Sequence, residues 1–250
     1  MYLGVPLALI GVWWAVSEQS DSFYFPPLSK IAEVFGPTWF EGRFGTDVMP
    51  SILRLFAGYA IALIVGVGAG IAIGLSRTLR AFTEPTLEFF RAIPPPVLIP
   101  IVMLFLGIFT PMKIFVIAAG AVWPILLNTI EGVRGMDEVL RDTSKVYRLR
   151  PRSVLTTLVL RGASPAIAAG ARQALSVALI LMVISEMFAA SNGIGFTLVQ
   201  FQRGFMMPEM WAGIILLGLI GVALSLIFQI TERTVLAWYH GQRQSQRGAS

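Results

Sequence analysis

Long apolar segments alternate with short polar ones along the whole chain. A helix needs about 20 apolar residues to cross a bilayer, and most of these segments reach or approach that length. We therefore predict an all-α integral membrane protein with about six transmembrane helices in a single domain, residues 1–250, with its core at about 50–240. The predicted spans cover about residues 3–17, 51–76, 86–106, 111–130, 165–190 and 211–238.

The first apolar segment, residues 3–17, could also be a secretory signal peptide. No Lys or Arg precedes it and no A-x-A-like cleavage site follows it, whereas signal peptides carry both features. We interpret it as the first membrane helix. The polar and aromatic residues 18–50 that follow predict an ordered loop with one short interfacial helix near Ser29–Phe35.

Small residues form two stripes within the predicted spans. Each stripe repeats every four positions, which places its members on one face of a helix. In lipid, small residues allow helix backbones to approach closely, so we expect both stripes to be helix-packing surfaces. The first comprises Gly58, Ala62, Gly66, Gly70 and Gly74, and the second Gly162, Ala166, Gly170, Ala174 and Ala178.

Composition agrees with a membrane location and restricts the chemistry. Hydrophobic residues make up 56% of the chain and charged residues 13%, whereas soluble domains are about 25% charged. Without cysteine, disulfides and thiolate sites are excluded. The one histidine, His240, lies in the polar C-terminal segment, which excludes histidine-dependent catalysis within the membrane. We predict that the chain is not an enzyme and has no catalytic, cofactor-binding or metal-binding residues.

Prolines and one carboxylate interrupt the apolar spans. Pro94 and Pro95 lie in the third predicted span, and the backbone groups that such prolines free are tolerated where a helix is buried in protein or lines a cavity. Glu186 lies near the end of the fifth, where it is either functional or a hydrogen-bonded structural group near the interface. The candidate pathway or gating residues are Glu186, Pro94, Pro95 and, in the polar turn that follows, Asn192.

The polar segment 134–161 is the most basic part of the chain. Its seven Lys or Arg residues outnumber its three acids. Apolar residues from Val139 to Tyr147 recur on one helical face, and those from Val154 to Val159 mark a second face that begins after Pro151. We predict two short amphipathic helices whose apolar faces are covered by a partner or by the membrane surface. A solvated basic loop held near lipid is the alternative.

The basic residues also predict an orientation. Segments on one side of the predicted spans contain twelve Lys and Arg, and those on the other contain four. Because excess Lys and Arg marks the cytoplasmic side, we expect both termini and segment 134–161 in the cytoplasm and residues 18–50 and 191–208 outside. The sequence contains no G-x-x-x-x-G-K-[ST] loop, so a nucleotide site, if ATP drives the protein, lies on another chain.

The polar segment resembles the cytoplasmic EAA loop of permeases from ATP-binding cassette (ABC) importers. Asp142-Thr143-Ser144 stands at the Glu-Ala-Ala position, Arg148 at the usual Gly, and Leu160-Arg161 at the usual Leu-Pro. Further motifs, in family order and at family spacing over about residues 20–240, resemble the nitrate/sulfonate/taurine branch of these permeases. They are Glu88–Pro95, Trp123–Thr129, Glu131–Gly135, Ser185–Met187 and Ser191–Phe196.

The resemblance implies a multi-pass permease subunit of the bacterial cytoplasmic (inner) membrane that forms the translocation path for a small solute. The implied partners are two ABC ATPase subunits carrying ATP and Mg, a second permease copy in a homodimer, an extracytoplasmic substrate-binding protein and the lipid bilayer, but no nucleic acid. The ATPase subunits are expected to dock at Val139, Leu140, Asp142, Thr143, Ser144, Val146, Tyr147, Arg148, Arg150 and Arg152.

A secondary transporter or channel that is not driven by ATP is the alternative function. Such a protein should have paired intramembrane charges and inverted internal repeats. In the predicted spans Glu186 is interpreted as a lone acid, and no convincing repeat is present. We therefore favour the ATP-driven importer.

Overall fold

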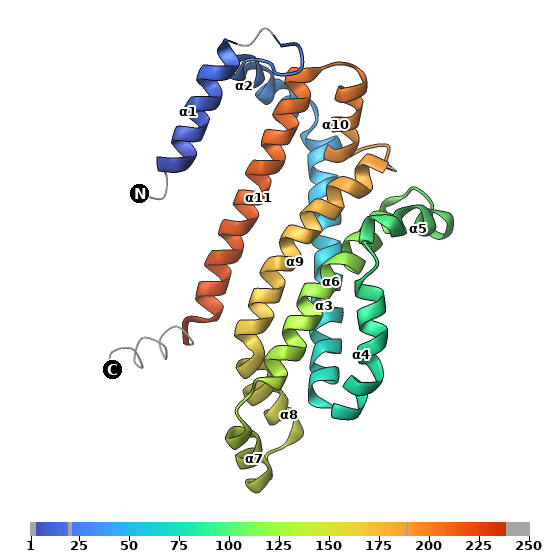
Figure 1. The fold of residues 1–250 in the computed structure, drawn as a ribbon, viewed down its shortest axis with the longest axis vertical. Coiled ribbons are helices and arrows are strands. Elements are labelled where there is room, and N and C mark those ends of the chain that lie inside the picture. Colours follow the sequence, from blue (N-terminus) through green and yellow to red (C-terminus); the bar gives the residue numbers. More distant parts are fainter. Residues whose placement is uncertain (1–3, 20–21, 189, 239–250) are drawn as a thin grey trace.

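The computed structural model describes residues 4–19, 22–188 and 190–238, which form helices joined by short turns, with no strand among them. Figure 1 shows α3, α6 and α9 side by side in the centre, with α4 and α5 on one flank and α1 and α11 on the other. The α-helices are α1 (Gly4–Glu18), α2 (Leu28–Gly36), α3 (Met49–Leu75), α4 (Arg77–Arg91), α5 (Leu98–Leu106), α6 (Thr110–Arg134), α7 (Glu138–Val146), α8 (Pro151–Ser153), α9 (Leu160–Phe188), α10 (Ile194–Arg203) and α11 (Met207–Val235). Turns of π-helix occur at η1 (Pro37–Gly42), η2 (Phe44–Val48) and η4 (Val154–Val159), and a 3₁₀ turn at η3 (Pro95–Val97).

Four helical segments of the described chain are long and apolar enough to cross a membrane. They are residues 44–75, 110–134, 151–188 and 207–235, and the bent α4–α5 pair makes a fifth if it is one broken span. The apolar part of α1, Ala8–Glu18, is shorter than these. An all-α membrane protein is thus confirmed, whereas the sixth span is not.

The third predicted span, residues 86–106, is broken at the prolines that interrupt it. α4 ends at Arg91 and α5 begins at Leu98, and the two are bent by 74°. Pro94 has an extended backbone, with φ −62° and ψ 123°, because a following proline disfavours the helical conformation. The proline run therefore breaks the span instead of bending it gently.

The second short amphipathic helix predicted in segment 134–161 is not separate from the span that follows. Residues 151–188 form one continuous helical segment, although we expected the span to begin at Pro165. Pro165 cannot donate a hydrogen bond to the carbonyl of Arg161, and the Ser164 hydroxyl donates to that oxygen instead, at 2.8 Å. The helix can therefore continue through the proline, and the polar segment 134–161 is joined directly to the apolar part of α9.

The first stripe of small residues is the surface of α3 that packs on α6. A Cβ atom added at Gly58, Gly66 or Gly70 would lie 2.6–2.8 Å from side-chain atoms of α6, and one added at Gly74 would meet Val133 equally closely. A Cβ at Gly68, which is outside the stripe, would meet nothing within 4 Å. The packing prediction is confirmed, and only glycine allows this separation of the two backbones.

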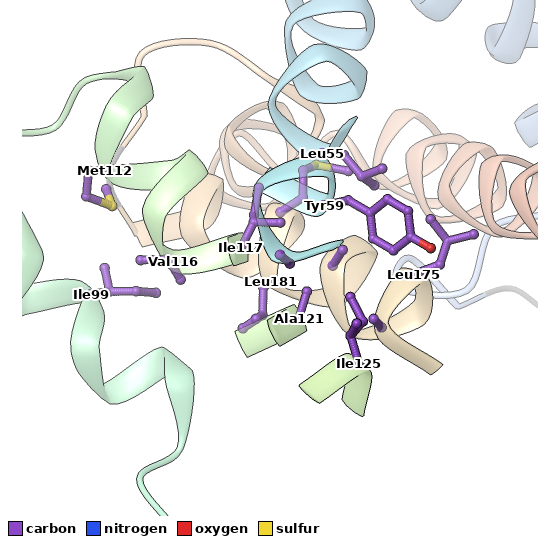
Figure 2. Close-up of a cluster of buried hydrophobic side chains, with 14 of the residues drawn as sticks. Leu55, Tyr59, Ile99, Met112, Val116, Ile117, Ala121, Ile125, Leu175 and Leu181 are labelled. Carbon is purple, nitrogen blue, oxygen red and sulfur yellow. The ribbon is translucent and has the colours of Figure 1, made fainter. Parts of the chain in front are cut away.

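The second stripe packs α9 against the other side of α6. Ala174 and Ala178 are fully buried, and a Cβ added at Gly170 would lie 2.6 Å from the carbonyl oxygen of Pro124 on α6. Figure 2 shows the apolar cluster where these helices meet, including Leu55, Ile117 and Leu181. Within it, the Tyr59 hydroxyl on α3 donates to the Ala171 carbonyl on α9 at 2.9 Å. The three helices thus form the core that connects the two ends of the molecule.

Candidate functional site

The segment 137–159, here called the hairpin, begins with a capped helix. Asp137 is the N-cap of α7, and its carboxylate accepts a hydrogen bond from the Val139 backbone N–H at 2.8 Å, which satisfies one of the unpaired donors of the first turn. Lys145 and Asp142 pair at 2.8 Å, both about 70% exposed. The first amphipathic helix predicted from the sequence is therefore present, and Figure 1 shows it at the end of the molecule where α3 passes into α4.

The hairpin turns at Arg148, which has a left-handed backbone with φ +48°. The N–H of Arg148 donates to the Lys145 carbonyl and that of Leu149 to the Ser144 carbonyl, both at 3.0 Å. Helices commonly end in this way with a glycine at the left-handed position. Arg148 therefore holds a conformation that glycine adopts more easily, and it places a long basic side chain at the turn.

The predicted docking residues of α7 divide into an outer and an inner set. Val139, Val146 and Tyr147 are 71%, 78% and 74% exposed, and Asp142 and Thr143 are also exposed. Ser144 is buried, and Leu140 and Ser144 line a cavity behind the helix. Arg150 and Arg152 are exposed beyond the turn. Large apolar side chains on the outside of a short polar helix indicate a surface that a partner covers.

The opposite end of the core holds a buried polar group that we call the Arg54–Glu186 cluster: Asp47, Ser51, Arg54, Glu186 and Asn192, with the backbone N–H groups of 193–195. Arg54, in the second turn of α3, donates to a Glu186 carboxylate oxygen at 2.7 Å, and the two side chains are 6% and 0% exposed. The Ser51 hydroxyl lies 2.8 Å from both oxygens of that carboxylate. Burying two charges is tolerated only with this degree of pairing and hydrogen bonding.

The cluster also fixes the start of α10. The N–H groups of Gly193, Ile194 and Gly195 donate to Asp47, the Ser51 hydroxyl and Glu186 at 2.8, 2.9 and 3.1 Å. Two carboxylates and the Ser51 hydroxyl thus accept hydrogen bonds from the unpaired donors of this helix, and the carboxylates also balance its positive dipole end. Arg54 also donates to the side-chain oxygen of Asn192 at 2.6 Å and to its carbonyl at 3.2 Å. The 192–195 turn is therefore tied to both α3 and α9.

This geometry corrects the interpretation of Glu186 as a lone acid. Its partner Arg54 lies inside the predicted span 51–76, and the sequence analysis missed it together with Asp47 and Ser51. The available signal was the charge itself, because an arginine in an apolar helix requires a partner. Since Glu186 is fully buried, its carboxylate lines no open path in this conformation. Roles of Glu186 and Asn192 in gating stay predictions.

The two candidate prolines lie apart from this cluster. Pro94 is exposed and Pro95 is partly buried, and Pro95 faces Gly120 of α6, where an added Cβ would lie 3.1 Å from its ring.

A second charged pair that sequence reasoning missed, Arg172–Glu232, joins α9 to α11. Within the described ranges, no group of three His, Asp or Glu side chains could hold a metal. His240 lies outside those ranges.

Comparison with known proteins identifies a matching protein family and several related transport proteins. The sequence model of the family "Binding-protein-dependent transport system inner membrane component" matches residues 62–236. The taurine transport system permease protein TauC of Escherichia coli is 29% identical over 250 residues, covering 97% of this chain and 90% of the relative. The bicarbonate transport system permease protein CmpB of Synechococcus elongatus is 32% identical, covering 93% and 90%. A putative aliphatic sulfonates transport permease, SsuC of Bacillus subtilis, is 25% identical over 94% of this chain and 86% of its own length.

Solved structures agree at the level of the fold. An inward-facing form of the MetNI methionine ABC transporter superposes with a TM-score of 0.62 at 19% identity, covering 76% of this chain and 93% of that chain. A chain of an amino acid ABC transporter crystallised with histidines superposes with a TM-score of 0.57 at 13% identity, covering 83% and 95%.

Proposed function

This chain belongs to the family of binding-protein-dependent transport system inner membrane components as a permease subunit of an ABC importer, and we propose that the hairpin 137–159 is the surface on which separate ATPase subunits act. The observation that carries this proposal is the exposed apolar side of α7, formed by Val139, Val146 and Tyr147. Exposed Asp142 and Thr143 lie beside it. Such a combination suits docking into a groove on a protein partner.

The continuous helix 151–188 supports a mechanical role for the hairpin. A force applied at α7 reaches residues 151–159 and passes along one unbroken helix to the far end of the core. Because α3 and α9 both pack closely on α6, we propose that the core moves largely as a unit. The broken α4–α5 segment, with Pro94 and Pro95 at its break, would then open and close the path between two permease copies.

ATP and Mg are proposed to bind to the ATPase subunits, and loaded binding protein to approach the opposite end of the permease. A ligand shifts a conformational equilibrium only by its difference in affinity for the two states. Import therefore requires that ATP and the loaded binding protein favour different states of the hairpin and the path. We also propose six spans, counting α1 and the α4–α5 pair, with both termini and the hairpin in the cytoplasm of the inner membrane.

The transported solute is proposed to be small and to carry an anionic group. The names of three relatives specify taurine, aliphatic sulfonates and bicarbonate, all of which fit that description. Uptake of labelled sulfonates and bicarbonate by cells expressing this permease with its ATPase and binding protein tests the proposal. Uptake restricted to neutral or cationic solutes contradicts it.

Docking is tested with the double variant Asp142→Arg/Thr143→Arg. Both side chains are exposed, and the lost Asp142–Lys145 pair contributes little to stability, so membrane insertion should be normal. We expect the ATPase subunits to be lost on co-purification, together with uptake. Glu33→Arg places a new cation at an exposed position of α2, at the other end of the molecule, and should retain the ATPase subunits on co-purification. Normal ATPase binding by the double variant contradicts docking at α7.

A further inference from the structure

A cavity of about 890 Å³ lies between α7 and the first turns of helix 151–188. Its walls are mainly apolar and include Leu75 from the end of α3, Leu140 from α7, and Leu155 and Leu158 from the start of the long helix. Arg77, Lys145 and Arg148 also line it. The site therefore combines hydrocarbon surface with several positive charges.

The cavity has more positive than negative charge. Lys145 is paired with Asp142 on the outer surface, and Asp137, the one acid among the lining residues that the structure describes, accepts the N-cap hydrogen bond of α7. No carboxylate lies within ion-pair distance of Arg77 or Arg148 among the side chains that the structure describes. Two guanidinium groups at the cavity are thus free to bind an anion.

The turn of the hairpin contributes one of these groups at an energetic cost. Arg148 holds a left-handed backbone, which disfavours every residue with a Cβ and which glycine adopts freely. This conformation brings the chain back toward helix 151–188, so that Arg148 and the adjacent Leu149 both line the cavity. A strained residue that supplies a charge to a cavity is a feature of binding sites.

The position of the cavity identifies the kind of anion. Leu75 is the last residue of the apolar helix α3, and Arg77 is the first of α4, which has no buried residue. In the orientation proposed above, the cavity would lie where hydrocarbon gives way to head groups, and basic pockets at this level on the cytoplasmic side suit anionic lipids. We propose that the cavity binds an anionic phospholipid, with its phosphate at Arg77 and Arg148 and its first acyl carbons against Leu75, Leu155 and Leu158.

A lipid suits the cavity better than a segment of the ATPase does. An acidic ATPase side chain would satisfy the two arginines but would leave the apolar walls uncovered. The apolar side chains offered to a protein partner, Val139, Val146 and Tyr147, do not line the cavity. The bound lipid would support α7 from behind while the ATPase holds it from the front. This inference extends the proposed function, since the lipid would set the position of the docking helix.

Native mass spectrometry of the detergent-purified permease tests the proposal, with and without its co-purified ATPase subunits. The sample is incubated with equal amounts of phosphatidylglycerol and phosphatidylcholine. We expect selective retention of phosphatidylglycerol, weakened about fivefold by Arg77→Gln and again by Arg148→Gln. Leu155→Trp, which fills the apolar wall without changing charge, should also reduce retention. Arg152→Gln removes an exposed cation that does not line the cavity and should leave retention unchanged.

Two further measurements separate this inference from ATPase docking. Asp142→Arg/Thr143→Arg should lose the ATPase subunits but keep phosphatidylglycerol. Equal retention of both lipids, displacement of the lipid by excess inorganic phosphate, or its expulsion from the wild type by ATPase binding overturns the lipid proposal. An equal effect of Arg152→Gln and Arg148→Gln would also overturn it, because the hairpin would then attract lipid by its net charge alone.

Discussion

The hairpin and the Arg54–Glu186 cluster lie at opposite ends of the same three-helix core. The charged pair of the hairpin is exposed to solvent, whereas that of the cluster is buried. The hairpin pair Lys145–Asp142 is three residues apart in sequence and about 70% exposed. The Arg54–Glu186 pair joins residues 132 apart and is almost fully buried. Exposed pairs contribute about 0–1 kcal/mol, whereas removing one partner of a buried pair costs about 3–5 kcal/mol. One end is therefore available to a partner, and the other fixes the architecture.

The largest effect that this difference predicts is that of Glu186→Gln. The change keeps the size of the side chain but leaves Arg54 charged and buried without a counter-ion, so we expect destabilisation by about 3–5 kcal/mol. The fall in heat-unfolding midpoint of the purified protein in detergent measures it. The matched control is Glu88→Gln, which removes an equally short ion pair with exposed Arg91 and should cost less than about 1 kcal/mol. Equal shifts would show that the buried pair has no special role.

The double variant Arg54→Met/Glu186→Met sharpens the same test. Replacing a buried ion pair by apolar side chains of similar volume is often far less harmful than removing one charge. It also removes the acceptor of the Gly195 N–H and the donor to Asn192. We therefore expect it to recover part of the stability lost in Glu186→Gln but not to restore the wild-type fixation of the 192–195 turn. Hydrogen exchange of the Gly193–Gly195 amides measures that fixation.

A smaller effect is expected in the core that connects the two ends. Gly66→Ala places a Cβ 2.8 Å from Ile125 of α6, and such overpacking costs about 1–3 kcal/mol. Gly68→Ala, two residues along the same helix, meets nothing within 4 Å and should be neutral or gain up to about 1 kcal/mol from helix propensity. The heat-unfolding midpoints of the two purified variants in detergent compare these effects. If both variants behave alike, the stripe does not set the separation of α3 and α6.

Sequence reasoning predicted the features that repeat locally and missed those that depend on distant partners. The four-residue spacing of Gly58, Ala62, Gly66, Gly70 and Gly74 predicted the α3 packing face, and the apolar positions of Val139–Tyr147 predicted α7. The prolines at 94–96 predicted that the third span is interrupted, but a proline run does not predict the angle of the bend.

The Arg54–Glu186 cluster shows why the rest was harder to predict. Glu186 was recognised as a costly charge, but its partner is 132 residues away, and only the packing of α3 beside α9 brings the two together. The Ser164 hydroxyl donates to the Arg161 carbonyl just before Pro165, which is a local contact. A proline can end a helix or only kink it, so the sequence did not predict that the helix continues from the hairpin into the membrane. In the same way, the spacing of Leu140 and Ser144 predicted a helix but not that both residues line a cavity.

The turn of the hairpin provides a prediction of intermediate size. Arg148→Gly removes the side chain and relieves the left-handed backbone, whereas Arg148→Ala removes the side chain but keeps that strain. We expect the glycine variant to protect the amides of Tyr147–Leu149 from hydrogen exchange by about 1 kcal/mol more than the alanine variant does. Equal protection in the two variants would show that the turn is not held in the left-handed conformation. Within the Arg54–Glu186 cluster the residue with positive φ is already a glycine, Gly193.

The smallest stability effect is expected at Asp142. Asp142→Asn breaks the exposed pair with Lys145, so the free energy of unfolding should change by less than about 0.5 kcal/mol. The same change should nevertheless weaken ATPase binding, because a surface used by a partner is sensitive to charge even where the fold is not. Because exposed charges are screened by salt, the loss of ATPase binding should be largest at low ionic strength.

Thr156→Ala is the control for both measurements, because Thr156 is exposed on the long helix and its hydroxyl donates only to the backbone of its own helix. A variant that lost stability but kept ATPase binding would invert the comparison, and the hairpin would then be the structural end of the molecule.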